Sequence, residues 1–590
     1  MLTGTAKAPF RRLHHEADLC VVGGGMAGLC AALAAARHGA KVVLMHDRPV
    51  LGGNSSSECR MHVCGADCSG TRPYMRETGL VEEIRLENIF RNPLKNLSVW
   101  DLVLLEKARF QPNLTLLLNC SCTDAAMNGA AIESVEGWQL TTQTRHTVKA
   151  RYFADCSGDS VLAPLTGAAW RMGREARSEF NESIAPLRSD NRTMGMTCLF
   201  QARLHQTPQP FESPAWARKF KDCKELPYGF EGHDAWSYGY WWVELGGEKD
   251  ALHDTETLRD ELHALVLGIW DHIKNSGHHP ESANWALEWL QFLPAKRESR
   301  RYEGDHILTQ HDIEAEGPFD DVVAYGGWPM DDHHPAGFGA VALGEKATIF
   351  HPAPSPYGIP YRILYSRNID NLFFAGRNAS CTHAAMSSTR VMATCAVLGQ
   401  AVGTAAALAA ERGLSPRETG RSQIRELQAR LLKDDCYLPG LRRDPSALTR
   451  EAGLTASAGD PEPVRDGWTR QILADPHAWS TAPGGWVAYA FTKTARVREA
   501  EVILDTGMEV QVGMILQPGF DRDYRVSPAM PKAFRLEGRR GAAWETLFRC
   551  DDNRRRQWII PVDRDLDGLR LVLETNHGAP ESRVYAFTVS

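Results

Sequence analysis

Three histidines stand in polar or glycine-containing stretches, the kind of segment that often carries ligand-binding side chains. His62 follows "GGNSSSECRM", His333 lies in "GGWPMDDHHP", and His383 lies in "RNASCTHAAMSS". The ordinary pKa of imidazole is near neutrality, so a histidine can take the proton of a substrate hydroxyl group. Arg60 and Arg362 supply guanidinium groups that can orient a polar substrate. We predict that at least one of these histidines is a general base; the alternative for each is a structural role.

The elements that would position these side chains begin with a strand, a glycine turn, a helix and a second strand. In "DLCVVGGGMAGLCAALAAARHGAKVVLMH", residues 19–22 and 42–45 are apolar, and "GGGMAG" has the spacing G-x-G-x-x-G. Such a turn lets a pyrophosphate approach the backbone, and the helix N-terminus offers free N–H groups to the phosphates. The alternative is a glycine-rich structural turn. The predicted dinucleotide contacts are Gly23, Gly25, Met26, Ala27 and Gly28.

The end of the second strand differs from the usual dinucleotide pattern. An acid that binds the ribose is expected about 20 residues past the last glycine. This sequence has His46 near that position, followed by Asp47 and Arg48. A neutral imidazole can accept a hydrogen bond from a ribose hydroxyl group. The Asp47 carboxylate can accept the same hydrogen bond if the strand bends. His46, Asp47 and the backbone alone all remain open as the ribose contact.

Three further blocks extend the predicted cofactor site. "RPVLGGNSSSE" places a polar loop after the second strand, and "RYFADCSGDSVLA" ends an apolar strand in a polar turn. "NLFFAGRNASCTHAAMSSTRVMATCAVLGQAVGTAAA" joins a short strand to a helix of small residues, whose positive end can face a ligand. The candidate cofactor contacts in and beside these blocks are Gly52, Gly53, Asn54, Ser55, Ser56, Cys122, Cys156, Ser157, Gly158, Gly376, Arg377, Ser388, Thr389, Arg390 and Val391.

Together with "KRESRRYEGDHILTQHDI" and "YGIPYRILY", these blocks resemble the FAD-dependent oxidoreductase family with a glutathione-reductase-type (two-dinucleotide-binding-domain) FAD fold. The resemblance covers roughly residues 17–440. It implies FAD as the cofactor. General flavoproteins of this fold carry glutamate at the position of His46 and aspartate at that of Arg377. Arg377 would bring a cation towards the pyrophosphate or ribityl chain.

The composition is that of an ordinary folded protein. The chain has 590 residues, 24% of them charged, and a net charge of −7, which predicts no binding to nucleic acid or anionic membranes. No apolar signal segment or helix long enough to span a membrane is expected, so we predict a cytoplasmic protein. The fourteen cysteines are predicted to be reduced thiols without a metal site. A redox disulfide near Cys59 and Cys64 is the alternative.

The predicted fold class is α/β. A Rossmann-like FAD-binding domain contains an inserted α+β substrate domain and is followed by an all-β, jelly-roll-like sandwich similar to galactose-binding domains. The predicted bounds are 17–165 and 361–440 for the FAD-binding domain, 166–360 for the substrate domain, 441–462 for a linker and 463–590 for the sandwich. The sandwich either binds carbohydrate or only packs against the catalytic part.

Within the substrate domain we expect an aromatic strand in residues 234–250, two amphipathic helices in 267–292 and a loop at 326–339. Most of its tryptophans are expected in the core. Trp328 is the best candidate for a stacking face that binds a flat ligand, because it lies in a polar loop.

The predicted function is oxidation of a hydroxyl-rich small molecule, such as a sugar or glycoside, by hydride transfer to flavin N5 with a histidine base. One alternative is a C–C bond dehydrogenase or reductase, in which Arg297, Arg300 and Arg301 bind substrate carboxylates. Another is a non-catalytic carbohydrate-binding protein. The electron acceptor is left open, because no second G-x-G-x-x-G is present for NAD(P)H.

Overall fold

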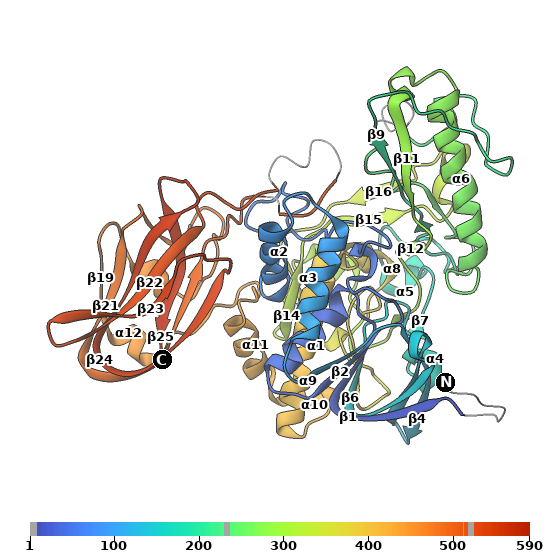
Figure 1. Ribbon diagram of the computed structural model, residues 1–590. Helices are drawn as coiled ribbons and strands as arrows, with labels where there is room; N and C mark the ends of the chain where they lie inside the picture. Colours follow the sequence, from blue (N-terminus) through green and yellow to red (C-terminus); the bar gives the residue numbers. More distant parts are fainter. Residues whose placement is uncertain (1–8, 229–235, 511, 517–523) are drawn as a thin grey trace, which may run out of the picture.

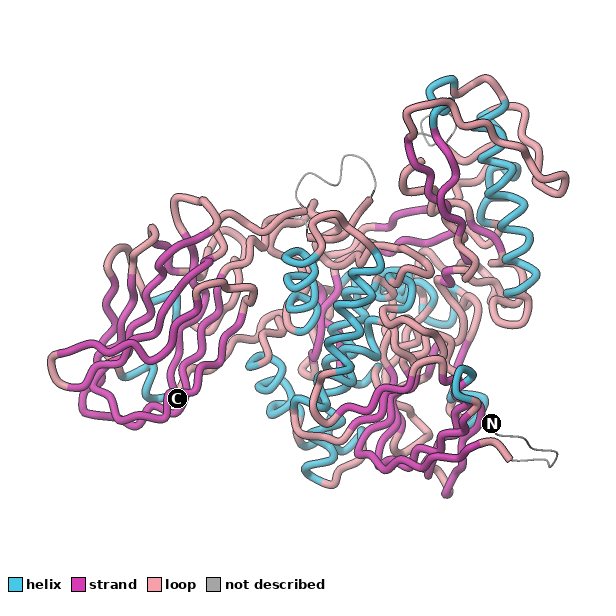
Figure 2. The backbone as a smooth tube through the Cα atoms, viewed as in Figure 1, coloured by secondary structure: helices cyan, strands magenta, loops and turns pink. Residues whose placement is uncertain are grey.

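The protein has a central body with one unit projecting on each side (Figure 1). The computed structural model describes residues 9–228, 236–510, 512–516 and 524–590. Helix α6 (Thr255–Asn275) lies in one projecting unit, and the C-terminal strands form the other. Figure 2 shows that this C-terminal unit is built almost wholly from strands and loops.

The central body is built on a seven-stranded sheet. Its strands are β1 (Arg11–Val22), β2 (Val42–Met45), β3 (Leu114–Leu117), β4 (Cys120–Asn128), β5 (Ala131–Gln139), β6 (Thr144–Asp155) and β18 (Leu372–Phe374). The order is β3-β2-β1-β6-β5-β4, and β18 pairs with the end of β6. All neighbours are parallel except the pairs β4–β5 and β5–β6. The predicted Rossmann-like α/β body is confirmed.

Strand β1 is longer than the sequence pattern predicted. Apolar residues indicated a strand at 19–22, whereas β1 starts at Arg11. The polar first half forms a strand because it pairs in parallel with β6, from Arg11 opposite Thr144 onwards. Its side chains are largely solvated, so no run of apolar residues marks it.

The parallel strands of the body end at one edge of the sheet. Val22 at the end of β1 pairs with Met45 of β2 and Asp155 of β6, and Phe374 of β18 also pairs with Asp155. The turns that follow hold "GGGMAG", "HDRP", "CSGD" and "AGRN". Blocks more than 300 residues apart in the chain are therefore neighbours, as a switch point of an α/β sheet requires.

Helices cover the sheet, and two of them cross closely. The helices of the body are α1 (Met26–Arg37), α2 (Leu80–Arg91), α3 (Leu97–Arg109), α4 (Leu162–Thr166), α8 (His383–Thr389), α9 (Met392–Arg412), α10 (Pro416–Ser422) and α11 (Ile424–Lys433). A Cβ atom added at Gly399 or Gly403 of α9 would come within about 2 Å of an α1 carbonyl oxygen. Helix α9 has the length and hydropathy of a membrane span, but 94% of that window is buried inside the protein.

The inserted unit combines short antiparallel strands with helix α6. Its strands are β7 (Trp170–Arg171), β8 (Met196–Thr197), β9 (Phe200–Leu204), β10 (Glu244–Leu245), β11 (Trp285–Leu290), β12 (Ala295–Lys296), β13 (Arg301–Tyr302), β14 (Val322–Gly326), β15 (Met330–His333), β16 (Thr348–His351) and β17 (Tyr357–Pro360). Two short helices, α5 (Arg177–Phe180) and α7 (Gln310–Glu314), complete it. Trp236, Trp242 and Trp270 pack in its core, as expected for most tryptophans of this region.

Three local expectations in this unit were wrong. The second helix expected within 267–292 is strand β11, because pairing with β9 outweighs the helical spacing. The aromatic stretch is mostly turns, with only Glu244–Leu245 in a strand; its first residues, Asp234 and Ala235, lie outside the described residues. The expected loop at 326–339 contains strand β15, which pairs with β16.

In its described residues the C-terminal unit is all-β apart from the short helix α12 (Ala447–Glu451) and a 3-10 turn at Glu462–Arg465. Its strands are β19 (Gly453–Ala456), β20 (Trp479–Thr481), β21 (Trp486–Leu504), β22 (Pro531–Arg540), β23 (Ala543–Cys550), β24 (Gln557–Asn576) and β25 (Ser582–Val589). The predicted all-β composition is confirmed, and the jelly-roll assignment stays a prediction. The expected linker contains α12 and β19, and β19 pairs with β21.

Buried polar contacts tie the C-terminal unit to the body. Arg76 and Glu82 form an ion pair at 2.8 Å with both side chains 1% exposed, and Thr506 Oγ1 donates to Glu82 at 2.7 Å. Arg556 pairs with Asp435 at 2.7 Å, also out of solvent. Unpaired, these charges would be costly in the interior. This supports the packing role that was one of the two alternatives for this unit.

Candidate active site

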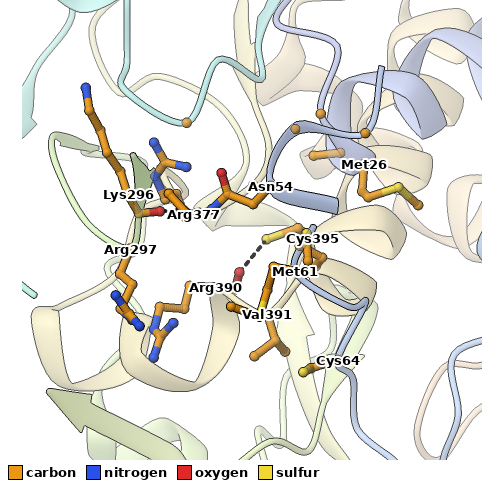
Figure 3. A pocket seen from close by; sticks show the side chains of 18 of the residues that line it. Met26, Asn54, Met61, Cys64, Lys296, Arg297, Arg377, Arg390, Val391 and Cys395 are labelled. Carbon is orange, nitrogen blue, oxygen red and sulfur yellow. Dashed lines mark hydrogen bonds between the residues drawn. The ribbon is translucent and has the colours of Figure 1, made fainter. Parts of the chain in front are cut away.

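A cavity of about 690 Å³ lies where the turns of the body meet the inserted unit. Figure 3 shows Met26 of the body on one side and Lys296 and Arg297 of the inserted unit on the other, with Asn54 between them. A volume of this size suits a large organic ligand. Ile515 of the C-terminal unit also lines the cavity.

The backbone at Gly25 forms an open cradle on the cavity wall. A Cβ atom there would meet no protein atom closer than Gly53 Cα, at 3.9 Å. Gly25 is the N-cap of α1, no side chain caps the helix, and its first turn holds no acidic residue. The first N–H groups of α1 are therefore available to an anion, and these residues fit the pyrophosphate of a dinucleotide.

His46 does not have a ring nitrogen left for a ribose. Its Nδ1 accepts the Gly24 N–H at 2.9 Å, and its Nε2 therefore donates to the Val50 carbonyl at 3.0 Å. The ring is 3% exposed. His46 thus holds the glycine turn in place, which corrects its predicted contact with the ribose. Asp47 lines the cavity with a largely exposed carboxylate and stays a candidate.

Arg377 lines the cavity beside a second cation. Asp159 accepts from Arg377 Nη2 at 2.7 Å and from Lys296 Nζ at 3.1 Å. Burial opposes ionisation of Asp159, but the two cations outweigh it and hold the pKa of this carboxyl well below its usual range. Arg377 Nε is buried without a hydrogen-bond partner among the described residues. Because two cations, Arg377 and Lys296, face one carboxylate, this wall of the cavity keeps a net positive charge. This agrees with the prediction that Arg377 brings a cation to the site.

Most of the predicted cofactor contacts are brought together around the cavity. The predicted residues that line it are Gly23, Gly25, Met26, Ala27, His46, Asp47, Arg48, Gly52, Gly53, Asn54, Cys156, Ser157, Gly158, Gly376, Arg377, Arg390 and Val391. Their direct contact with a cofactor stays a prediction.

Six predicted contacts are not part of the cavity lining; they are Gly28, Ser55, Ser56, Cys122, Ser388 and Thr389. A Cβ atom at Gly28 would lie 1.8 Å from the Gly23 oxygen, so this glycine serves helix packing, as its motif position implies. Ser55 and Ser56 donate to the Gly52 and Gly53 carbonyls and shape the loop.

The other three of the six are engaged elsewhere in the fold. Ser388 bonds to the Trp328 carbonyl and the Tyr357 hydroxyl, Thr389 contacts Cys381 Sγ at 3.7 Å, and Cys122 sits on β4. The predicted cofactor contact of these residues is therefore corrected to structural roles.

Of the three predicted histidines, His62 is the one suited to act as a base. It lines the cavity, and burial lowers its pKa to about 4, so that the ring is neutral at pH 7. Its Nδ1 lies 2.7 Å from the oxygen of the Tyr238 hydroxyl. The same hydroxyl is placed to donate to Met61 Sδ, 3.6 Å away. If the tyrosine donates to the sulfur, Nδ1–H donates to the tyrosine and Nε2 carries the lone pair.

His333 lines the cavity, but it is held between two carboxylates. Its Nδ1 is 2.6 Å from Glu244 and its Nε2 3.3 Å from Asp331. Burial opposes the charge, yet Glu244 and Asp331 together raise the pKa of His333 above its usual value. Both ring nitrogens are engaged by these carboxylates, so neither is free to take a substrate proton, and the predicted base role of His333 is corrected.

His383 is buried behind the cavity and is not part of its lining. Its Nδ1 lies 2.9 Å from Glu298 and its Nε2 3.0 Å from Asp332. Burial disfavours the charged ring, but these two carboxylates raise its pKa to about 10. His383 is therefore a charged structural residue, and its predicted role as the base is corrected.

The raised pKa of His383 predicts that stability falls at alkaline pH. The stabilisation is fully present below the unfolded-state pKa of about 6.5 and is lost as the pH rises through about 10. The slope can reach about 1.4 kcal/mol per pH unit. We expect the thermal midpoint of the wild-type protein to fall between pH 7 and 10 more steeply than that of His383→Gln. Equal slopes would contradict a charged His383.

Arg60 and Arg362 do not contact the cavity. The Arg60 guanidinium stacks 4.0 Å from the ring centroid of Trp289 and bonds to Gln201. Arg362 is half exposed and pairs with Asp321 at 3.0 Å on the surface. Both predicted catalytic roles are corrected. Trp289 and Gln201 hold the Arg60 guanidinium, and Asp321 holds that of Arg362, away from the cavity.

Besides Arg48 and Arg377, two further arginines line the cavity, and each is already paired. Figure 3 shows Arg297 and Arg390 on the same side of it. Arg297 Nη1 lies 3.2 Å from Glu244 and donates to Thr197 Oγ1 at 2.7 Å. Arg390 Nη2 lies 3.0 Å from Asp331. Arg301, by contrast, is buried against Glu175 and Glu298, so the arginine cluster is mostly a seam of ion pairs.

Sequence reasoning missed several residues that line the cavity. Tyr238 and Trp241 fall in the aromatic stretch that was expected to form a strand, and their aromatic character was the only available signal. Asp159 lies inside a quoted block, but its ion pairs with Lys296 and Arg377 join three distant segments. Trp328 lines the cavity as predicted.

The cysteines are free thiols throughout. Burial raises the pKa of Cys59 to about 11 and that of Cys64 to about 12, which disfavours thiolates at neutral pH. The predicted reduced state agrees with this, and the redox-disulfide alternative has no support from the geometry.

A family model described as "FAD dependent oxidoreductase" matches residues 18–431. No curated protein matches the chain. Among solved structures, a chitosan-binding module from Paenibacillus sp. IK-5 is 14% identical, with a TM-score of 0.17, over 24% of this chain and 95% of the module. A family 32 carbohydrate-binding module from Streptococcus pneumoniae EndoD is 17% identical, with a TM-score of 0.18, over 24% and 98%. Such low TM-scores identify neither a fold nor a ligand.

Proposed function

Because the chain belongs to the FAD-dependent oxidoreductase family, we propose that it oxidises an alcohol group of a hydroxyl-rich small molecule, such as a sugar or glycoside, with His62 as the base. FAD is the cofactor that the family uses. When bound, it supplies an acceptor for the hydride that leaves the substrate carbon. The glycine cradle at Gly25 and the cations Arg377 and Lys296 would hold its phosphates.

The neutral ring of His62 is the observation that carries the proposal. In the proposed step the hydroxyl proton moves to Nε2 of His62, the C–H electron pair leaves as hydride, and the alcohol becomes a carbonyl group. In the proposed tautomer Nδ1–H donates to the Tyr238 hydroxyl, which leaves the lone pair on Nε2, and this contact orients the ring. Burial keeps the imidazole unprotonated before the reaction.

The aromatic side chains at the cavity support a sugar-like substrate. Trp241 and Trp328 both line it, and an indole face packs well against the apolar face of a pyranose. Trp241 stands edge-on to His333 at 5.7 Å between ring centroids, which fixes its orientation.

The alternative of C–C bond oxidation needs free cations that bind carboxylates. Of Arg297, Arg300 and Arg301, only Arg297 lines the cavity, and its guanidinium is engaged by Glu244 and Thr197. A substrate carboxylate would have to compete with these partners. The pairing therefore favours an uncharged, hydroxyl-bearing substrate.

Anaerobic titration of the holoenzyme tests the proposal. We expect at least one sugar or glycoside to bleach the absorbance of the oxidised flavin, and saturated carboxylic acids to leave it unchanged. A control titration with dithionite establishes that the bound flavin can be reduced. Bleaching by carboxylic acids, with none by any sugar or glycoside, would overturn the proposed substrate class in favour of the alternative.

A further inference from the structure

A second cluster of chemically active side chains lies outside the cavity, in the inserted unit. Cys223 belongs to a short 3-10 turn, His272 to the last turn of α6, and His278 and His279 to the segment just after α6. Their approximate position is the C-terminal end of α6 in the projecting unit of Figure 1. None of the four lines the cavity.

The three histidines converge on one sulfur atom. Cys223 Sγ lies 3.1 Å from His272 Nε2, 3.7 Å from His278 Nδ1 and 3.5 Å from His279 Nε2. The ligand atoms of Cys223, His272 and His278 all lie within 4.8 Å of one another, and His279 stands outside this group although its Nε2 is near the sulfur. Zinc bound to sulfur at about 2.3 Å and to nitrogen at about 2.05 Å, with tetrahedral angles, places each nitrogen about 3.6 Å from the sulfur. The observed spacing is close to this value.

The outer nitrogen atoms of two rings support the same conclusion. His272 Nδ1 is 3.2 Å from the Phe220 carbonyl, which can only accept, so Nδ1 carries the proton and Nε2 carries a lone pair directed at Cys223. His279 Nδ1 lies 3.5 Å from the Glu281 carboxylate, which favours the same tautomer. Donation of the outer N–H to a carbonyl or carboxylate is the usual arrangement of histidines that bind a metal.

We propose that Cys223, His272, His278 and His279 bind one Zn²⁺ ion in a tetrahedral Cys₁His₃ site. Thiolate and imidazole ligands suit zinc, and His279 Nε2, 3.5 Å from the same sulfur, would close the tetrahedron of a structural site on metal binding. On binding, the Cys223 thiol releases its proton to solvent and the metal–sulfur bond forms without any redox change.

The zinc ion would join three segments of the inserted unit. It links the turn at Cys223 to the end of α6 and to the segment that leads into β11. Trp236 packs edge-on against His279, at 6.3 Å between ring centroids, and Tyr238, two residues further on, lines the cavity. Metal ligation at this point therefore stabilises the fold beside the aromatic part of the cavity wall.

Metal analysis of the full-length holoenzyme, purified without chelator or metal-affinity tag, tests the site. We expect about one zinc per chain in the wild-type protein, and at least about a 100-fold weaker zinc affinity in Cys223→Ser and His278→Gln. His278 is exposed, so His278→Gln is expected to fold even if Cys223→Ser does not, and its FAD content reports its integrity.

Matched substitutions at residues away from the cluster serve as controls. Cys550→Ser changes a buried cysteine of the C-terminal unit, and His253→Gln changes an exposed histidine of the inserted unit. Both variants are expected to keep about one zinc per chain. The proposal is overturned if the wild-type protein contains no zinc and takes up none from solution, if His278→Gln binds zinc as tightly as the wild type, or if stoichiometric iron or copper occupies the site instead.

Discussion

Replacing His62 with glutamine is expected to slow reduction of the flavin by an alcohol substrate about 10²- to 10⁴-fold, the usual contribution of a general base. Glutamine preserves polarity and approximate size, but it cannot take a proton. Because burial lowers the pKa of His62 to about 4, the wild-type rate should be constant near neutrality and fall only as the pH approaches 4. Anaerobic stopped-flow measurement of flavin absorbance, with a substrate found by the titration above, gives this rate.

Two comparisons separate proton transfer from positioning. Tyr238→Phe removes only the hydroxyl that holds the ring of His62, so we expect a smaller loss, about tenfold, with the acid limb of the pH profile retained. His62→Gln should lose that acid limb while binding FAD normally. Wild-type rates in His62→Gln would exclude this histidine as the base.

The second large effect is expected at Gly25. A methyl group added there should weaken cofactor binding while the protein still folds. The new Cβ atom has no protein atom within 3.8 Å, and φ of Gly25 is −65°, which alanine adopts without strain. The same atom occupies the space through which a pyrophosphate reaches the helix N-terminus. We expect Gly25→Ala to fold but to bind FAD about 10- to 100-fold more weakly. Flavin fluorescence titration of the apoprotein measures this affinity.

Two other glycines supply the controls for Gly25. Gly453 in β19 also has open space at its Cβ position, with the nearest atom at 3.6 Å, and lies far from the cavity; Gly453→Ala should bind FAD normally. Gly28→Ala would place a methyl group 1.8 Å from the Gly23 oxygen and should damage the fold itself. Normal FAD affinity in Gly25→Ala would show that no phosphate approaches the backbone there.

Local sequence patterns were sufficient for the core of the cofactor-binding body. Residues 42–45 form β2 as predicted, and "GGGMAG" joins β1 to α1, because a strand, a turn and an amphipathic or buried helix depend on residues close together in the chain. The blocks around Cys156 and Gly376 were assigned to the same site through the family resemblance, and the structure shows why they meet: their parallel strands end at one edge of the sheet.

Pairing between distant segments decided where local patterns failed. The apolar spacing around Trp285 suited a helix, but β9 offered a partner strand and β11 formed. The first half of β1 has no apolar signature, and its strand exists because β6 lies beside it. Such pairings contribute hydrogen bonds that no window of sequence contains.

By itself the sequence determined that a Rossmann-like α/β body is present and which turns line its cavity, because both follow from short motifs of fixed spacing. Only the tertiary structure decided which histidine can act as a base. Glu298 and Asp332, which keep His383 charged, stand 85 and 51 residues away from it, whereas His62 is kept neutral by burial. The proposed zinc site likewise depends on contact between Cys223 and His272, which are 49 residues apart in the sequence. Protonation and metal binding depend on neighbours in space, and the fold alone supplies those neighbours.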